Sequence, residues 1–224
     1  FKNRNQKEAE YLDPSHPEVL AHISSIVKKM VGWGYELIKH DFTTADLFDD
    51  FGMNLTSTIT NADNWHFYDK TKTNAEIVLE LYRLIKDAAG DMLIIGCNTV
   101  SHLSAGLVHI YRTGDDTSGY DWERTKKMGV NTLAFRLAQN EIFYMCDADC
   151  VGILKNKIPW EKNRQWLELL SKSNTPLFVS CTDDIDEIKR AEIRKAYKTF
   201  NEPHSIVPSD IFGTKIPSEW EIDG

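Results

Sequence analysis

The sequence contains 224 residues, of which 42% are hydrophobic and 11% aromatic, so the chain can bury a substantial core. Its formal net charge of −8 and pI of about 5.4 exclude broad affinity for nucleic acid, because binding of phosphates needs clustered Lys and Arg. No apolar run approaches the ~20 residues that cross a bilayer, and the first residues lack the apolar region of a signal peptide. We therefore expect a globular protein with no nucleic-acid or membrane partner.

Helix-like and strand-like patterns alternate along the chain. The first helix is predicted at about 17–31, with Ser15 as its N-cap and Gly32 at its end, and a strand follows at 35–39. Asp184 is the expected N-cap of the last helix. The other elements are expected as a partial strand at 10–12, helices near 74–89, 101–108, 132–139, 161–171 and 184–199, and strands at 92–97, 109–112, 142–146 and 176–181.

Short, continuously apolar strands that alternate with helices are typical of a parallel sheet covered by helices on both faces. The sequence therefore predicts the α/β class. Roughly five strand-helix units can be counted, fewer than the eight that close a (β/α)8 barrel, so the alternatives are an open sheet and part of a barrel. Residues 201–224 hold three prolines and no helical period, which indicates a linker toward a further domain.

A long segment, residues 43–73, places aromatic residues among many Asn, Asp and Thr residues. Loops of this length commonly form the walls or lids of functional sites. Aromatic rings beside Asn and Asp suit a sugar, whose ring faces stack and whose hydroxyls need hydrogen-bond partners. An aromatic cluster that only anchors the loop fits the pattern equally well.

The first candidate for chemistry is an acid at the end of a predicted strand. Because strand side chains alternate, Lys39 and Asp41 are expected on one side and Ile38 and His40 on the other. An ammonium group beside the Asp41 carboxylate favours its ionised form, which a nucleophile requires. The alternative is an ordinary salt bridge at a strand end.

The second candidate is a pair of adjacent acids, Asp115 and Asp116, just after the strand that ends at Arg112. One of two neighbouring carboxylates keeps its proton to higher pH, since ionising both is electrostatically costly, and a general acid needs that behaviour. Arg112 favours the anion, so we expect it to bind ligand hydroxyls and orient the acid rather than to touch it permanently. An Asp-rich turn without a catalytic role is the alternative.

The four cysteines, Cys97, Cys146, Cys150 and Cys181, fall at or just after predicted strands and are expected to be reduced. The segment from Cys146 to Cys150 has no second Cys or His pair that would complete a tetrahedral zinc site. We therefore expect no metal.

Several of these segments resemble motifs of the α-galactosidase (melibiase) clan of glycoside hydrolases. Lys39-His-Asp41 resembles its Lys-x-Asp nucleophile motif, and Arg112-Thr-Gly-Asp-Asp116 resembles its Arg-x-x-x-Asp acid/base motif. Supporting matches are Tyr11–Pro17, Gly96-Cys97-Asn98 and Cys146-Asp-Ala-Asp149. Each motif is short, but they follow one another in the clan's order over roughly residues 11 to 224.

The resemblance implies a (β/α)8 TIM-barrel type of fold, present as an incomplete barrel of about strands four to eight in residues 1–200. Residues 201–224 would then be a linker toward an absent C-terminal β-sandwich domain. The clan's aromatic and Asp residues from the first two strands have no counterpart here. Ala148 stands where the clan usually has a proline.

Carried over residue by residue, the resemblance implies that Asp41 is the nucleophile and Asp116 the acid/base. No cofactor and no metal are implied. The resemblance also implies that the sugar hydroxyls are bound by Lys39, Arg112 and Asp149. Asn98 and Cys97 would form the wall of the pocket that discriminates at one position of the sugar ring.

The function expected from the resemblance is retaining hydrolysis of α-galactosides. Alternatives are an α-N-acetylgalactosaminidase or galactosyl transferase of the same clan, and a carbohydrate-binding protein without turnover. A phosphate-binding enzyme is disfavoured because no Gly-rich loop joins a strand to a helix. The expected partners are an oligosaccharide or α-galactoside substrate, the rest of the barrel and a C-terminal β domain. Localisation stays open between the cytoplasm and the bacterial periplasm or exterior.

Overall fold

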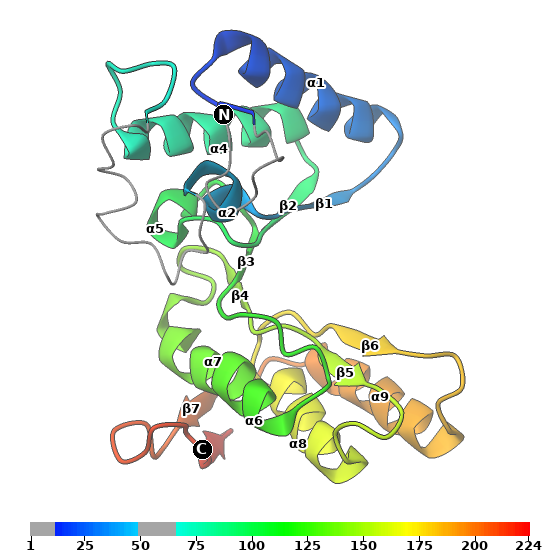
Figure 1. The fold of residues 1–224 in the computed structure, drawn as a ribbon. Helices are drawn as coiled ribbons and strands as arrows, with labels where there is room; N and C mark the ends of the chain where they lie inside the picture. Colours follow the sequence, from blue (N-terminus) through cyan, green and yellow to red (C-terminus); the bar gives the residue numbers. More distant parts are fainter. Residues whose placement is uncertain (1–11, 49–65) are drawn as a thin grey trace. The chain divides into compact units, whose positions relative to one another are not determined.

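The computed structural model describes residues 12–48 and 66–224, and the chain divides into two compact units, residues 1–111 and 112–224 (Figure 1). The predicted partial strand at 10–12 and Tyr11 fall outside or at the edge of the described residues, as does most of the segment 43–73. The prediction that this segment forms a sugar-binding wall is therefore untested.

The first unit is a parallel sheet with helices packed beside it. Strand β1 pairs in parallel with β2, and β2 pairs in parallel with β3, while helix α1 packs on helix α4 (Figure 1). The elements are α1 (Pro17–Gly32), β1 (Leu37–His40), α2 (Thr43–Phe48), α4 (Asn74–Ala89), β2 (Leu93–Gly96), α5 (Ser101–Ser104) and β3 (Ile110–Arg112). The alternation of parallel strands and helices confirms the α/β class for this unit.

Helix α4 has the bounds that its sequence predicts, because its ends carry strong local signals. Thr73 and Glu76 form a capping box, in which each side chain accepts a hydrogen bond from the other's backbone N–H. The apolar stripe of this helix is buried, and Tyr82 is buried with it. Helix α1 begins where expected, but its N-cap is His16, whose ring accepts from Glu18 N. The prediction of Ser15 as the cap was wrong, since the Ser15 hydroxyl donates to Asp13.

The second unit holds two separate strand pairs and a buried apolar core. Strands β5 and β6 pair in parallel, β7 and β8 pair antiparallel, and helix α8 packs on helix α9. The core centres on Trp166, which is 1% exposed. The elements are α6 (Trp122–Thr125), a π-helical turn (Lys126–Val130), α7 (Asn131–Arg136), a 3-10 turn (Leu137–Gln139), β4 (Met145–Asp147), β5 (Val151–Ile153), α8 (Trp160–Ser171), β6 (Val179–Cys181), α9 (Glu187–Phe200), β7 (Ile206–Pro208) and β8 (Trp220–Ile222).

Several predicted boundaries in the chain were wrong. The helix expected at 101–108 ends at Ser104, and the helix expected at 132–139 belongs to a helical segment that begins at Trp122. Strand β4 starts three residues later than expected, because Ile142 is 73% exposed and lies in a turn. Helix α9 is capped by Asp186, whose side chain accepts from Lys189 N, and not by Asp184.

Residues 201–224 contain the β7 and β8 strands, which pair between Ile206 and Ile222. The proposed division into a barrel at 1–200 and a linker at 201–224 toward a C-terminal β-sandwich domain stays a prediction. Among the helices of the described residues, none combines the length and the apolar composition that a membrane crossing requires.

Candidate active site

In the first unit, Asp41 follows β1 directly and accepts several donors. Its Oδ1 accepts hydrogen bonds from Asn98 Nδ2 and from Phe42 N, both at 2.7 Å. Its Oδ2 lies 3.4 Å from Lys39 Nζ. Lys39 belongs to β1, and Asn98 follows β2 by two residues. The predicted neighbours Lys39, Asn98 and Cys97 are therefore gathered around the predicted nucleophile.

These contacts decide the ionisation of Asp41. Partial burial raises the pKa of this carboxyl, but the hydrogen bonds from Asn98 and Phe42 N and the Lys39 charge together lower it below its ordinary value. The thiol of Cys97, which is 4% exposed, adds a further lowering contribution. Asp41 is therefore ionised at neutral pH, which is the state that a nucleophile needs.

His40 is the last residue of β1 and directly precedes Asp41. Its Nε2 shares a hydrogen bond of 2.8 Å with Thr43 Oγ1, and its ring packs edge-on against Tyr82 of α4. Burial lowers the pKa of His40 to about 4, so the ring is neutral at pH 7. Thr44 N donates to Asn98 O, which ties the start of α2 to the residue that holds Asp41.

Asp41 borders a cavity of about 420 Å³ within the first unit. Its walls combine apolar residues of α1 and α4, such as Val27 and Leu81, with Lys39 and Asp46. Burial and the nearby Asp41 charge raise the pKa of Asp46, so the two carboxyl groups differ in how readily they ionise. A carboxylate at the edge of a partly apolar cavity is an arrangement typical of ligand sites.

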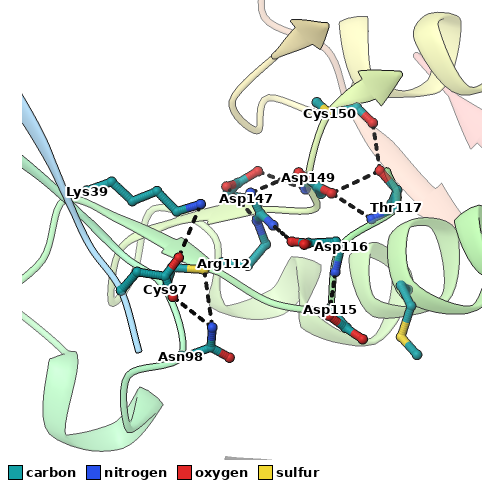
Figure 2. A network of polar contacts seen from close by, with 12 residues as sticks. Lys39, Cys97, Asn98, Arg112, Asp115, Asp116, Thr117, Asp147, Asp149 and Cys150 are labelled. Atoms are coloured by element: carbon teal, nitrogen blue, oxygen red, sulfur yellow. Dashed lines mark hydrogen bonds and ion pairs between the residues drawn. The ribbon is translucent and has the colours of Figure 1, made fainter. Parts of the chain in front are cut away.

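In the second unit, Arg112 joins three carboxylates. Its Nη1 lies 3.1 Å from Asp116 Oδ1, its Nε donates to Asp147 Oδ2 at 2.9 Å, and its Nη2 lies 2.8 Å from Asp149 Oδ1 (Figure 2). The Arg112 side chain is 9% exposed, Asp147 1% and Asp116 65%. The predicted acid/base is thus the solvent-facing member of a cluster whose other two carboxylates are buried.

Asp115 and Asp116 have different partners, although they are adjacent in the chain. Asp115 Oδ2 pairs with Arg124 Nη2 at 2.7 Å, and its Oδ1 accepts from Asp116 N at 2.7 Å. Arg124 Nε also donates to Asp116 O at 2.6 Å. Arg124 therefore holds the backbone of this turn and leaves the Asp116 carboxylate facing Arg112.

Asp149 is more deeply engaged than the sequence indicated. Besides Arg112, its Oδ2 accepts from Thr117 N at 2.6 Å and from Thr117 Oγ1 at 3.0 Å, and the residue is 6% exposed. Its expected role in binding sugar hydroxyls stays a prediction. Asp147 and Thr117 were missed as site residues, although the Asp-Ala-Asp spacing places a second acid beside Asp149 and is visible in the sequence.

Two glycines hold the loop that carries Asp116 against strand β5. Gly119 has a φ of +70°, and a Cβ added at Gly152 would lie 2.6 Å from Gly119 Cα and 2.8 Å from its N. Any side chain at either position must therefore push the loop away from the strand. Glycine at 152 allows the close approach that fixes the loop three residues beyond Asp116.

The substitution Gly152→Ala is expected to destabilise the protein by about 1–3 kcal/mol, because the added methyl group overpacks a backbone contact. Urea unfolding followed by tryptophan fluorescence measures this destabilisation. Gly32→Ala is the control, because a Cβ there meets nothing within 4 Å and should change stability little. Equal stability of the two variants would contradict the anchoring role of Gly152.

Within residues 12–48 and 66–224, no group of three or more His, Cys, Asp or Glu side chains is arranged to hold a metal ion. All four cysteines lie in the described residues and none forms a disulfide there, and Cys181 is exposed. Burial raises the pKa of both the Cys146 and Cys150 thiols to about 11, so neither is a thiolate at neutral pH.

No protein-family model matches the chain, and no curated protein matches its sequence. Solved structures do match its fold. An α-galactosidase from Thermus thermophilus, in complex with stachyose, is 16% identical with a TM-score of 0.59, over 83% of this chain and 39% of that one. A GH27 β-L-arabinopyranosidase from Geobacillus stearothermophilus is 15% identical with a TM-score of 0.59, over 83% and 41%. An α-galactosidase from Saccharomyces cerevisiae is 12% identical with a TM-score of 0.54, over 88% and 46%.

These matches define the fold as part of a (β/α)8 barrel of the kind found in GH27 glycoside hydrolases. The prediction of an incomplete TIM-barrel type of fold, resembling the α-galactosidase clan, is confirmed. The chain spans 39% to 46% of the length of the three structures described.

Proposed function

We propose that the protein is a retaining glycoside hydrolase that acts on α-galactosides. The observation that carries the proposal is the environment of Asp41, a strand-end carboxylate kept ionised by Asn98, Phe42 N and Lys39. The structural matches to α-galactosidases support the same class of reaction. In a barrel, residues at the carboxyl ends of the strands form the site, which is where Asp41 and Asp116 lie in the chain.

The proposed reaction divides the work between two carboxyl groups. Asp41 attacks the anomeric carbon and forms a glycosyl-enzyme ester, while protonated Asp116 gives its proton to the glycosidic oxygen and releases the leaving group. Asp116, now ionised, then takes a proton from water as that water attacks the anomeric carbon and frees Asp41. Two inversions give net retention, and the step needs no cofactor.

Sugar recognition is assigned in this proposal to Lys39, Arg112 and Asp149 at the hydroxyls, with Asn98 and Cys97 on the discriminating wall. The remaining barrel strands and a C-terminal β domain are proposed as partners of these two units. An α-N-acetylgalactosaminidase, a galactosyl transferase and a binding protein without turnover are the alternatives. A β-L-arabinopyranoside is a second candidate substrate, because a structurally similar enzyme carries that name.

The proposal predicts that the natural full-length protein hydrolyses p-nitrophenyl α-D-galactopyranoside. Four aryl glycosides should be compared by release of nitrophenol: the α-galactoside, its β-anomer, the α-N-acetylgalactosaminide and the β-L-arabinopyranoside. Early NMR spectra of the products should show α-galactose as the first anomer formed. Preference for another of the four sugars would reassign the substrate, and inversion would exclude the two-step mechanism. Sugar binding without any hydrolysis would favour the binding protein.

A further inference from the structure

Asp147 is the most buried charged residue of the Arg112 cluster, and no role has been assigned to it above. Its Oδ2 accepts from Arg112 Nε at 2.9 Å, its Oδ1 accepts from Asp149 N at 2.8 Å, and its backbone oxygen accepts from Thr113 N at 2.9 Å. These contacts tie strand β4 to the last residue of β3 and to the segment that carries Asp149. Asp147 therefore holds the Arg112 guanidinium at Nε (Figure 2).

The guanidinium is planar and its N–H groups point in fixed directions. Two hydrogen-bond partners therefore fix its orientation, and with it the direction of the third nitrogen's N–H groups. Asp147 takes Nε and Asp149 takes Nη2, which leaves Nη1 aimed at Asp116. The geometry of the predicted acid/base thus depends on two carboxylates that lie behind it.

The cluster also has an unequal charge balance. One cation, Arg112, faces three carboxylates, and two of them are buried and held at 2.9 Å and 2.8 Å. An arginine paired only with a catalytic acid would favour the ionised acid and oppose proton donation. Together, Asp147 and Asp149 carry more negative charge than Arg112 carries positive charge, so they offset the arginine beside Asp116.

We propose that Asp147 is a positioning residue for the acid/base: it orients Arg112 toward Asp116 and offsets the arginine charge, so that Asp116 can hold the proton it donates. This inference rests on the proposed function, in which Asp116 is the general acid. Asp147 acts through Arg112 and touches no substrate in this mechanism.

Among the described residues, the other charged and titratable groups that interact with this cluster are Asp115, Arg124 and the thiols of Cys146 and Cys150. Asp116 faces Arg112 from β3 and is preceded by Asp115, which pairs with Arg124 of α6. Asp147 faces Arg112 and Asp149, with the thiol of Cys146 next to it in β4. A change at Asp147 therefore reaches Asp116 through Arg112.

The test compares Asp147→Asn, Asp147→Ser and Asp147→Glu with Asp183→Asn in the natural full-length protein. Asp183 follows β6 and is the control that removes a carboxylate without touching Arg112. For each variant, kcat/KM is measured against pH on a disaccharide α-galactoside, whose leaving group needs a proton, and on an aryl α-galactoside, whose leaving group needs it less.

The neutral variants should lose about 10- to 100-fold in kcat/KM on the disaccharide at pH 7, because proton donation is impaired. On the aryl substrate the loss should be several-fold smaller, because only the part that comes from hydroxyl binding by Arg112 remains. The pH above which disaccharide hydrolysis declines should move to lower values. Asp147→Glu, which keeps the negative charge, should retain the wild-type pH profile, and Asp183→Asn should match wild type on both substrates.

Equal losses of kcat/KM on both substrates, with an unchanged pH profile, would overturn the inference. Failure of both neutral variants to fold would overturn it as well. Either result would assign Asp147 a structural role alone. If the wild-type protein hydrolyses α-galactosides and Asp116 is essential, such a result leaves the proposed function standing. A wild-type protein that hydrolyses no glycoside overturns both.

Discussion

The substitution Asp41→Gly is expected to lower hydrolysis of an aryl α-galactoside by on the order of 10³-fold or more, because it removes the nucleophile of the proposed mechanism. Glycine leaves a space beside Asn98 and Lys39 that a small anion can enter. Added azide should then attack the anomeric carbon directly from the side where Asp41 stood. The product should be β-galactosyl azide, which NMR spectroscopy identifies.

Asp46→Asn is the matched control for this experiment. Asp46 lies in α2 and lines the same cavity as Asp41, but it does not share the hydrogen bond from Asn98. We expect the control to keep hydrolysis within a few-fold of wild type and to gain nothing from azide. Turnover that survives in Asp41→Gly would exclude Asp41 as the nucleophile, and loss of activity without azide rescue would favour a structural role.

The elements that the sequence predicted best are those whose signals are local. Helix α4 combines an apolar stripe of helical period with a capping box at Thr73 and Glu76, and both signals lie within its own residues. The parallel strands β1 and β2 are likewise short apolar runs that follow helices. The contact between Lys39 and Asp41 follows from strand alternation alone.

The elements that were missed depend on packing between distant segments. Strand β5 is only Val-Gly-Ile, too short for a periodic signal, and it exists because it pairs with β6 and accommodates Gly119. The turn of π-helix at Lys126–Val130 has no sequence period of its own. N-caps were misplaced by one or two residues, since Ser15 and Asp184 bond elsewhere and leave the helix ends to His16 and Asp186.

The candidate site likewise contains contacts that the sequence predicted and contacts that it did not. The sequence predicted that Arg112 orients Asp116 without touching it permanently. That prediction was wrong, because Arg112 Nη1 and Asp116 Oδ1 are 3.1 Å apart. The sequence did not indicate that Asp147 and Asp149 share this arginine, because residues 35 and 37 positions away meet it only through the fold. The fold class and the contact between Lys39 and Asp41 were therefore predictable, and the sharing of one cation by three acids was not.

That sharing makes Arg112 the residue whose loss should destabilise the protein most. We expect Arg112→Met to lower the free energy of unfolding by about 3–5 kcal/mol at pH 7, because it leaves two buried carboxylates, Asp147 and Asp149, without their cation. Urea unfolding followed by tryptophan fluorescence measures this loss, since Trp166 lies in the core of the same unit. Arg124→Met is the matched control: Arg124 is 42% exposed and pairs with exposed Asp115, so its loss should cost about 1 kcal/mol or less.

The loss of unfolding free energy caused by Arg112→Met should become smaller as the pH falls. Burial raises the pKa of Asp147 above its ordinary value even though Arg112 lowers it, so removal of Arg112 raises that pKa further. A carboxyl group whose pKa is higher in the folded than in the unfolded chain binds its proton more tightly when folded. The variant therefore gains stability relative to wild type as the pH falls from 7 toward the raised pKa of Asp147. A loss that is equal at pH 7 and pH 5, or no greater than that of Arg124→Met, would contradict the view that buried carboxylates depend on Arg112.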